Sequence, residues 1–282
     1  MADWERGTPL AVGRAHAEPP STLTDPRVRA VPWRDLVPVS RLEVARELLL
    51  PLPWLAGSLA LAQHGLFAPA LGLSFVFFLT GLRVVHNAYH AALGIPRRAT
   101  EWVMFSLSLL MLGSMHAVKV THLLHHRRCM SDEDVEAASA RMSAVRTILV
   151  GPLFPVRLHR AALRAASPRE RRWIHAELMA GAGWVGLALG LLELKPLHYH
   201  ILAMAAGQCL TAFFAVWTVH HDCDRLRFIA RTLRGRLKNV ISFNMFLHVE
   251  HHLYPRVPTC HLARLAERLD AAAPELQQKR VF

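Results

Sequence analysis

Five stretches of the chain are almost continuously apolar, at residues 48–63, 66–85, 102–120, 174–194 and 197–219. Each approaches the length of about 20 residues that a helix needs to cross the hydrocarbon of a bilayer. The connectors within the first and the last pair, "QHGLFAP" and "ELKP", are very short, which predicts a helical hairpin for each pair. We therefore expect an all-α integral membrane protein with four transmembrane helices in two hairpins.

The middle stretch, 102–120, does not fit a simple crossing. It contains His116 and Lys119 together with several serines, which are costly on a lipid-exposed helix. We expect this stretch to lie in the interface, to enter the membrane and return, or to pack inside the bundle. Residues 142–165 mix arginines with Leu, Ile, Val and Phe, which predicts a further helix lying on the membrane surface.

Charge adds an orientation to this picture. The chain has a formal net charge of +12 and is 52% hydrophobic, and its arginines concentrate in residues 127–172 and after residue 224. Basic connectors remain in the cytoplasm, so we expect these segments and both termini on the cytoplasmic side of a multi-pass protein. The combination of basic and aromatic residues that lines a nucleic-acid groove is missing, so no nucleic-acid partner is expected.

Three segments are predicted along the chain: a polar N-terminal arm (1–43), a membrane domain (44–270) and a C-terminal tail (271–282). The arm is rich in acids, arginines and prolines and lacks the apolar core of a signal peptide. The four cysteines form no C-x-x-C pair, which argues against a zinc ribbon, a cysteine-bound iron–sulfur cluster and a thioredoxin-type motif.

Histidines gather in four tight groups. In chain order these are "HNAYH" (His86, His90), "HLLHH" (His122, His125, His126), "HHDCD" (His220, His221) and "HVEHH" (His248, His251, His252). Residues four apart share a helix face, whereas adjacent residues diverge by about 100°, so each H-x-x-H-H pattern can reach two different metal ions. Eight or nine imidazoles exceed the four ligands of one zinc ion. The pattern therefore predicts two first-row metal ions, with Zn, Cu, Fe and Ni all compatible with imidazole.

The predicted threading brings these groups to one face of the membrane. Residues 91–121 are long enough for a detour out and back, and residues 127–219 contain a basic connector and one hairpin, which makes an even number of crossings. In the third group we favour His221 over His220 as the ligand. Carboxylates orient metal-bound imidazoles through the second ring nitrogen. Acids close to the groups are candidates for this role, or else solvated loop acids: Asp132, Glu133, Asp134, Asp222, Asp224 and Glu250.

Over residues 66–268 the chain resembles the membrane fatty acid desaturase family, part of a superfamily that includes membrane hydroxylases and carotenoid ketolases. The resemblance rests on HNAYH, HLLHH and above all "NMFLHVEHHLYPRVP". It implies a non-haem diiron centre at the cytoplasmic ends of four spanning helices, with two Fe ions and O₂ as co-substrate. The ligands it implies are His86, His90, His122, His125, His126, His248, His251 and His252, with His221 as a further ligand. Asn244, four residues before His248, resembles the family asparagine that holds a metal-bound water.

The function that this resemblance implies is desaturation of a fatty acyl chain of a membrane lipid or another hydrophobic substrate. The substrate would enter an apolar tunnel built from residues 66–120 and 201–219. Because no flavin, haem or iron–sulfur motif is present, the electrons would come from a ferredoxin or cytochrome b5-like donor with its reductase. Arg127, Arg128, Arg256 or the 225–238 run would dock this donor, or would only set the topology.

Three other functions remain open from the sequence. A hydroxylase or ketolase acting on an alkyl chain or a carotenoid would use the same kind of metal centre. A metal transporter would carry its histidines within the spans, near the middle of the membrane. A zinc-dependent membrane hydrolase would need fewer ligands and a nearby catalytic base.

Overall fold

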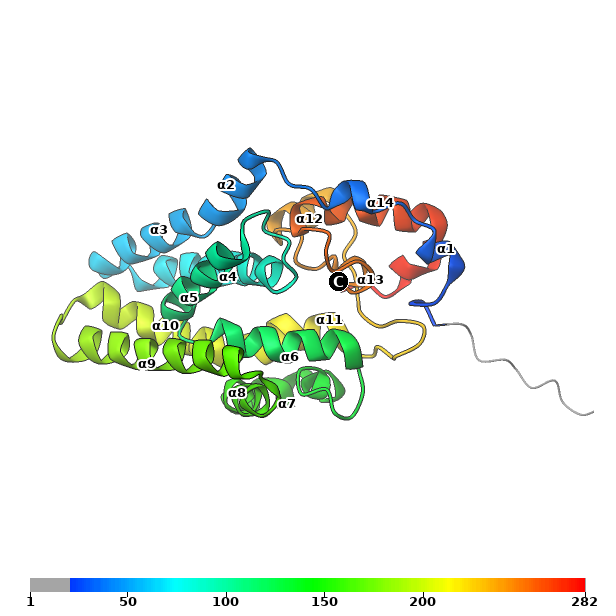
Figure 1. Cartoon of the computed structure of the whole chain (residues 1–282). Helices are drawn as coiled ribbons and strands as arrows, with labels where there is room; N and C mark the ends of the chain where they lie inside the picture. The colour runs from blue at the N-terminus through cyan, green and yellow to red at the C-terminus, as the bar shows by residue number, and fades with distance from the viewer. Residues whose placement is uncertain (1–20, 282) are drawn as a thin grey trace, which may run out of the picture.

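A computed structural model describes residues 21–281, and this part of the chain is almost entirely helical (Figure 1). The helices are α1 (Pro26–Arg29), α2 (Arg41–Leu49), α3 (Leu52–Gln63), α4 (Phe67–Tyr89), α5 (Arg97–Met111), α6 (Met115–Arg128), α7 (Ala144–Leu149), α8 (Leu153–Ala165), α9 (Pro168–Gly190), α10 (Lys195–Thr211), α11 (Thr218–His220), α12 (Arg236–Ile241), α13 (His248–Leu253) and α14 (Leu262–Ala272). Short 3-10 turns are η1 (Arg34–Leu36), η2 (Ala137–Arg141), η4 (Thr259–His261) and η5 (Pro274–Gln278), and η3 (Ala212–Trp217) is π-helical. Residues 21–281 contain isolated β-bridges but no named strand, so the all-α class is confirmed.

Two helical hairpins form the apolar part of the molecule. α3 packs along α4, and α9 packs against α10, with the two hairpin tips at the same end of the bundle (left in Figure 1). Three helical segments are long and apolar enough to cross a membrane, namely Arg41–Gln63, Phe67–Tyr89 and Lys195–His220. α9 covers the expected crossing at 174–194 but is not among them, because His175, Glu177 and several glycines lower its hydropathy. A crossing by α9 therefore stays a prediction.

The difficult stretch at 102–120 is broken between α5 and α6, whose axes are bent by 109°. Such a bend prevents this stretch from crossing as one straight helix. Two carbonyl groups at the break accept hydrogen bonds from α10: His200 donates to Leu110 at 2.8 Å and Gln208 donates to Met111 at 2.7 Å. Irregular backbone at membrane depth requires such protein partners, because lipid offers none. The break therefore directs α6 and its histidines back along the bundle.

The expected surface helix at 142–165 is present as two helices, α7 and α8, separated at Gly151 and Pro152. α8 is seen end-on in Figure 1, whereas α6 and α9 run across the view. Leu149, Leu153 and Val156 are exposed beside the arginines of this segment. Exposed apolar side chains next to arginines are typical of helices that lie at a membrane surface.

Residues 21–43, which the sequence predicts as a polar arm, pack closely against the C-terminal helices. Val28 and Leu36 share a hydrophobic core with Leu265 and Leu269 of α14. The Tyr254 hydroxyl after α13 donates to the Val28 carbonyl at 2.5 Å. The expected tail is packed as well, through Ala273 and Leu276 in the same core. The first twenty residues of the expected arm lie outside the described part of the chain.

Candidate metal centre

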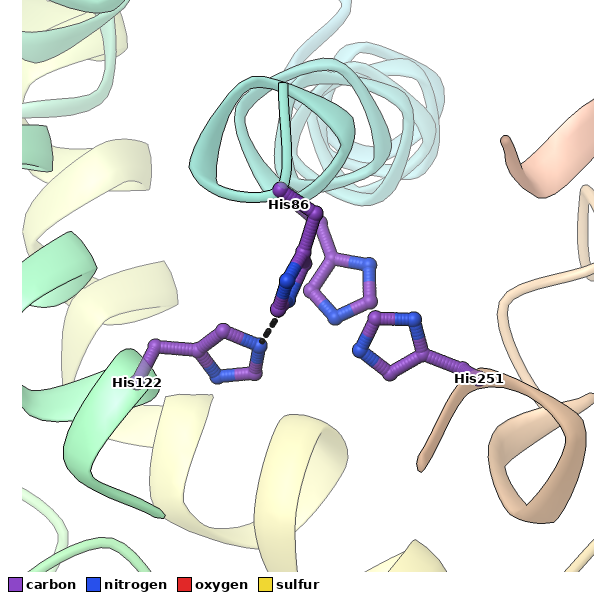
Figure 2. A group of neighbouring side chains, drawn as sticks. His86, His122 and His251 are labelled. Atoms are coloured by element: carbon purple, nitrogen blue, oxygen red, sulfur yellow. Dashed lines mark hydrogen bonds between the residues drawn. The ribbon is translucent and has the colours of Figure 1, made fainter. Parts of the chain in front are cut away.

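Histidines from α4, α6, α11 and α13 converge into two groups. The first group is His86, His90, His122 and His251, and the second is His125, His220, His248 and His252; within each, the ring nitrogens lie within 4.8 Å of one another. His126 extends the first group, because its Nε2 atom lies 3.1 Å from Nε2 of His122 and 2.9 Å from Nε2 of His251. Figure 2 shows His86, His122 and His251 pointing toward one another from three separate helices. Segments more than 160 residues apart therefore supply one compact cage.

Adjacent histidines enter different groups, as the helical geometry predicts. On α6, His125 belongs to the second group, whereas His126 lies against the first. On α13, His251 belongs to the first group and His252 to the second. Neighbouring side chains on a helix diverge by about 100°, so each H-x-x-H-H pattern bridges the two groups. The expected division of the adjacent histidines is confirmed.

The spacing of the nitrogens in the second group fits one metal ion. His220 Nε2 lies 3.1 Å from Nε2 of both His125 and His248. His252 Nε2 lies 3.2 Å from Nε2 of His248 and 3.3 Å from that of His125. A metal ion about 2.1 Å from each nitrogen, with neighbouring bonds about 90–105° apart, would separate the nitrogens by roughly 3.0–3.3 Å. The four rings therefore fit ligands on neighbouring positions around a single ion.

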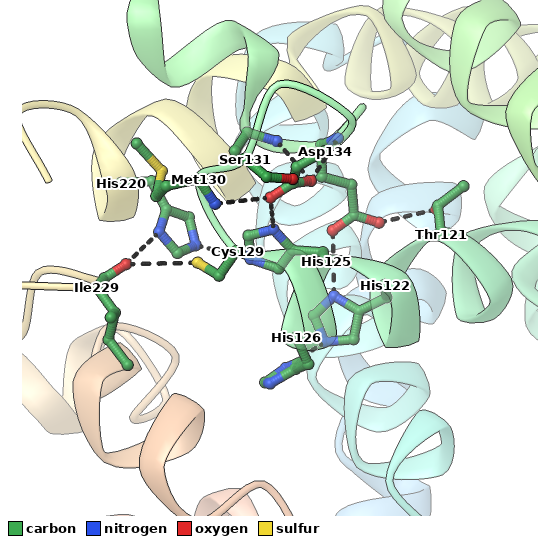
Figure 3. Close-up of polar contacts among 12 residues, drawn as sticks. Thr121, His122, His125, His126, Cys129, Met130, Ser131, Asp134, His220 and Ile229 are labelled. Atoms are coloured by element: carbon green, nitrogen blue, oxygen red, sulfur yellow. Dashed lines mark hydrogen bonds and ion pairs between the residues drawn. The ribbon is translucent and has the colours of Figure 1, made fainter. Parts of the chain in front are cut away.

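The protonation of these rings also favours a cation. His125 Nδ1 donates to the Asp134 carboxylate at 2.7 Å, and His220 Nδ1 donates to the Ile229 carbonyl at 3.0 Å (Figure 3). A neutral imidazole that donates from Nδ1 has only a lone pair at Nε2. In the neutral form of both rings, the two Nε2 atoms, 3.1 Å apart, therefore present facing lone pairs and cannot hydrogen-bond to each other. A metal ion between them would turn this repulsion into ligation.

Burial keeps the rings of α13 in the form that binds metal. His248, His251 and His252 are buried, and burial together with the surrounding imidazoles lowers the pKa of each well below its usual value. These rings are therefore neutral at physiological pH, as a ligand must be.

Two carboxylates orient rings of α6. Asp134 holds His125, and Glu136 accepts from His122 Nδ1 at 3.2 Å and from the Thr121 hydroxyl at 2.8 Å. Burial raises the pKa of Glu136 to about 7. Burial also acts to raise the pKa of Asp134, but the hydrogen bond and charge of His125, together with the backbone hydrogen bonds from Ala137 and Met130, leave that pKa lowered. Asp134 is among the acids that the sequence singles out, whereas Glu136 is missed.

The other candidate acids make different contacts. Glu250 is fully buried between the α13 histidines, yet its partners are Thr232 at 2.7 Å and Arg234 at 2.6 Å. Asp132, Glu133 and Asp222 pair with arginines, and Asp224 accepts from the backbone of the turn that follows it. Their expected contact with a histidine ring is therefore not observed, and Glu250 instead fixes α13 to the segment before α12.

The preference for His221 over His220 is wrong as a matter of geometry. His220 lies in the second group, whereas His221 stacks on Trp217 at 3.8 Å and donates from Nδ1 to the carbonyl of the same residue. The cause is the π-helical segment η3, which precedes α11. The wider π turn takes up an extra residue and so rotates the following side chains relative to an uninterrupted α-helix. Segments of this kind are frequent at functional sites.

The spacing of four residues between Asn244 and His248 would place both on one face of a helix, and the structure does not show this. α13 begins at His248, and Asn244 lies in the preceding turn with a left-handed backbone, at φ 60°. Its side-chain amide donates to the Thr259 carbonyl at 3.3 Å. Asn244 and His248 therefore do not share a helix face, and Asn244 instead fixes the turn that leads into α13.

His116 lies outside both groups and has a structural partner. It is buried at the start of α6, where Nδ1 lies 2.6 Å from the Glu177 carboxylate and the ring stacks on Trp173 at 4.9 Å. Glu177 also accepts from the Ser114 hydroxyl at 2.5 Å. This network joins α9 to the break between α5 and α6, which sets the start of the helix that carries His122, His125 and His126.

Comparison with known proteins adds a family to this geometry. The sequence model of the family described as fatty acid desaturase matches residues 60–281, a range that contains both histidine groups. Among curated proteins, none matches the chain.

Proposed function

The chain belongs to the fatty acid desaturase family, and from this premise we propose that it is a membrane-bound, O₂-dependent oxidoreductase that desaturates a fatty acyl chain. The observation that carries the proposal is the pair of adjoining histidine groups, each with the nitrogen spacing of a metal site. A hydrolase with one zinc ion would need only one such group. The histidines gather at the ends of helices, which also favours an oxidoreductase over a transporter with ligands near mid-membrane.

In this proposal each group holds one iron ion. The first ion would be bound by His86, His90, His122, His126 and His251, and the second by His125, His220, His248 and His252. When bound, the iron pair supplies the activation of O₂ and the removal of hydrogen from an unactivated C–H bond.

The protein's own residues prepare and hold the ligands. Asp134, Glu136 and the Ile229 carbonyl each accept a hydrogen bond from a ring Nδ1–H and so leave the lone pair of Nε2 free for metal. Burial excludes water from the cage and keeps the rings neutral. We propose that the acyl chain reaches the centre through the apolar helices of residues 66–120 and 201–219.

The proposal includes a cytoplasmic centre and a separate electron donor. The positive-inside bias supports placing the arginine-rich segments, both termini and the histidine groups on the cytoplasmic side. Arg127, Arg128 and Arg256 are exposed and suit an acidic ferredoxin or cytochrome b5-like carrier. Arg128 already pairs with Glu133, so Arg127 and Arg256 are the better candidates for contact with the carrier.

Metal analysis and product analysis together test the function. We expect the purified protein to hold about two iron ions per chain, and a host of known lipid composition to accumulate acyl chains with a new double bond. Hydroxylated alkyl chains or oxidised carotenoids, found by mass spectrometry instead, would identify a hydroxylase or ketolase.

A single variant links the metal to the product. His251→Ala removes a ligand from the first group and should abolish the product and lower the bound iron. His64→Ala, at an exposed position in the α3–α4 connector, serves as the control and should change neither. Normal iron and turnover in His251→Ala would contradict the assignment.

A further inference from the structure

A buried ion pair lies one helical turn before the first histidine box. Arg83 on α4 is 6% exposed and Glu47 on α2 is 7% exposed. The Arg83 guanidinium donates two hydrogen bonds to the Glu47 carboxylate, from Nε at 2.8 Å and from Nη2 at 2.5 Å. Both residues lie within segments that are apolar enough to span a membrane. Ionisable groups in such segments are costly and usually have a function.

The pair reaches beyond these two helices to the segment that carries the third histidine box. Arg83 donates from its remaining nitrogen, Nη1, to the Phe243 carbonyl. Asn87, one turn further along α4, donates to Glu47 at 3.2 Å and accepts from the Thr259 amide at 3.0 Å and the Thr259 hydroxyl at 2.7 Å. Residues 243 and 259 flank α13 on its two sides. The network therefore ties both ends of the α13 segment to α4.

The backbone is strained at the first of these contacts, where Arg83 binds the Phe243 carbonyl. Phe243 and Asn244 both have left-handed backbones, at φ 53° and 60°. Bulky residues keep this conformation only where their surroundings hold it. Arg83 holds the Phe243 carbonyl, and Asn244 donates to Thr259, which Asn87 binds in turn. The turn that aims α13 is thus fixed by polar contacts that start at α4.

We propose that the Glu47–Arg83–Asn87 network positions α13 against α4 and thereby assembles the first metal site selectively. This inference rests on the proposed two-metal function. The first group takes His86 and His90 from α4 and His251 from α13, so its geometry depends on the distance between these helices. The second group takes no ligand from α4. It takes His248 and His252 from α13, but Glu250 also holds α13 through hydrogen bonds to Thr232 and Arg234, which do not involve α4. Loosening the network should release one ion and spare the other.

A purely structural role for the network makes a different prediction. A buried ion pair that only holds helices together would, when disturbed, destabilise the whole domain. Both metal sites would then weaken together with the fold. Selective loss of one ion separates positioning from general stability.

Arg83→Lys is the main test, because lysine keeps the charge but cannot bind Glu47 with two hydrogen bonds while also donating to Phe243. Arg97→Lys is the matched control: Arg97 also pairs with a glutamate four residues away on α5, at a position where its side chain is 73% exposed. Asn87→Ala is a second variant that cuts the link to Thr259 and leaves the ion pair in place.

The full-length protein in detergent is titrated anaerobically with ferrous iron, and with cobalt(II) as an optical probe, while circular dichroism follows the helical fold. We expect two ions per chain in the unaltered protein and in Arg97→Lys. In Arg83→Lys and Asn87→Ala one ion should bind at least about tenfold more weakly, with the absorption spectrum of the other unchanged. Two ions bound at the original affinity would overturn the inference, as would parallel weakening of both ions, whether or not the fold is lost.

The same titration separates this inference from the proposed function. An unaltered protein that binds no metal pair would overturn both. An unaltered protein that binds two ions but forms no unsaturated product would refute only the desaturase activity and would leave the positioning role intact.

Discussion

Replacing Asp134 by asparagine should remove one metal ion from the centre by changing the tautomer of one ring. The Asp134 carboxylate accepts four hydrogen bonds: from His125 Nδ1 at 2.7 Å and from the backbone amides of Met130, Glu136 and Ala137 at 3.0–3.1 Å. All four partners donate. Asparagine offers one accepting oxygen and one donating NH₂ group in the same space. If the oxygen keeps Glu136 and Ala137, the NH₂ group faces His125 Nδ1 and the Met130 amide, which loses its acceptor.

The ring can satisfy this new donor only by moving its proton from Nδ1 to Nε2. Its Nε2 lone pair, which points toward His220 and His252, is then lost to the metal. Flipping the amide instead would leave two buried backbone N–H groups unpaired, each at a cost of about 1–3 kcal/mol. Loss of such an orienting partner typically weakens metal binding about 10–100-fold, or about 1.4–2.7 kcal/mol.

Competition with a graded series of chelators measures this loss for the two ions separately. We expect Asp134→Asn to release the second ion about 10–100-fold more readily while circular dichroism shows an intact fold. Asp132→Asn is the matched control, because Asp132 is exposed and pairs with Arg141 at the surface. Equal retention of both ions in Asp134→Asn and the unaltered protein would refute the tautomer argument.

Three further predictions test other parts of the structure. His220→Ala should lose the second ion, whereas His221→Ala should keep both, as measured by iron content; the reverse result would restore the sequence-based preference. Gly151→Ala should lower the free energy of unfolding by about 1–3 kcal/mol or more, seen as a lower thermal midpoint, because the new methyl would lie 2.0 Å from the Cys209 carbonyl oxygen. Gly186→Ala is the control and should not destabilise the protein, because no atom lies within 4 Å of the new methyl. Chelation of the metal should lower the thermal midpoint, because a metal present at 100 times its Kd adds about 2.7 kcal/mol to the free energy of unfolding. An unchanged midpoint would argue against a bound ion.

Much of the fold follows from the hydrophobic pattern. The short connectors "QHGLFAP" and "ELKP" predict the two hairpins, and the structure places both tips at one end of the bundle. The pattern could not show that the stretch at 102–120 breaks by 109°, because the break depends on hydrogen bonds from His200 and Gln208, about 90 residues away. The packing of residues 21–43 was missed for a related reason: its apolar side chains are isolated in the sequence and gain a core only when α14 covers them.

The histidine groups were predictable because their order rests on local helix geometry. Adjacent histidines on one helix must diverge, and on both α6 and α13 they enter different groups. His220 was missed because a π-helical segment has no simple sequence signal. Glu136 was missed because it lies fourteen residues after the ring that it contacts, in a run of acids whose other members contact arginines or His125. Local periodicity thus locates the histidines, whereas the partners that orient them depend on loop folding.

The charge balance of the centre links these orienting partners to the metal. Neutral imidazoles could not offset the charge of the two divalent ions in the proposed centre, and Asp134 and Glu136 are carboxylates that contact the rings of the two groups. Without a cation, burial raises the pKa of Glu136 to about 7, because a buried site disfavours a lone negative charge. A nearby cation favours the ionised form of a carboxylate and opposes this shift. The ionised form of Glu136 is therefore unfavourable in a metal-free cage and would offset the charge of an ion in the first site. Residues 134–136 contact one ring in each group, so this segment suits a centre in which both sites are filled.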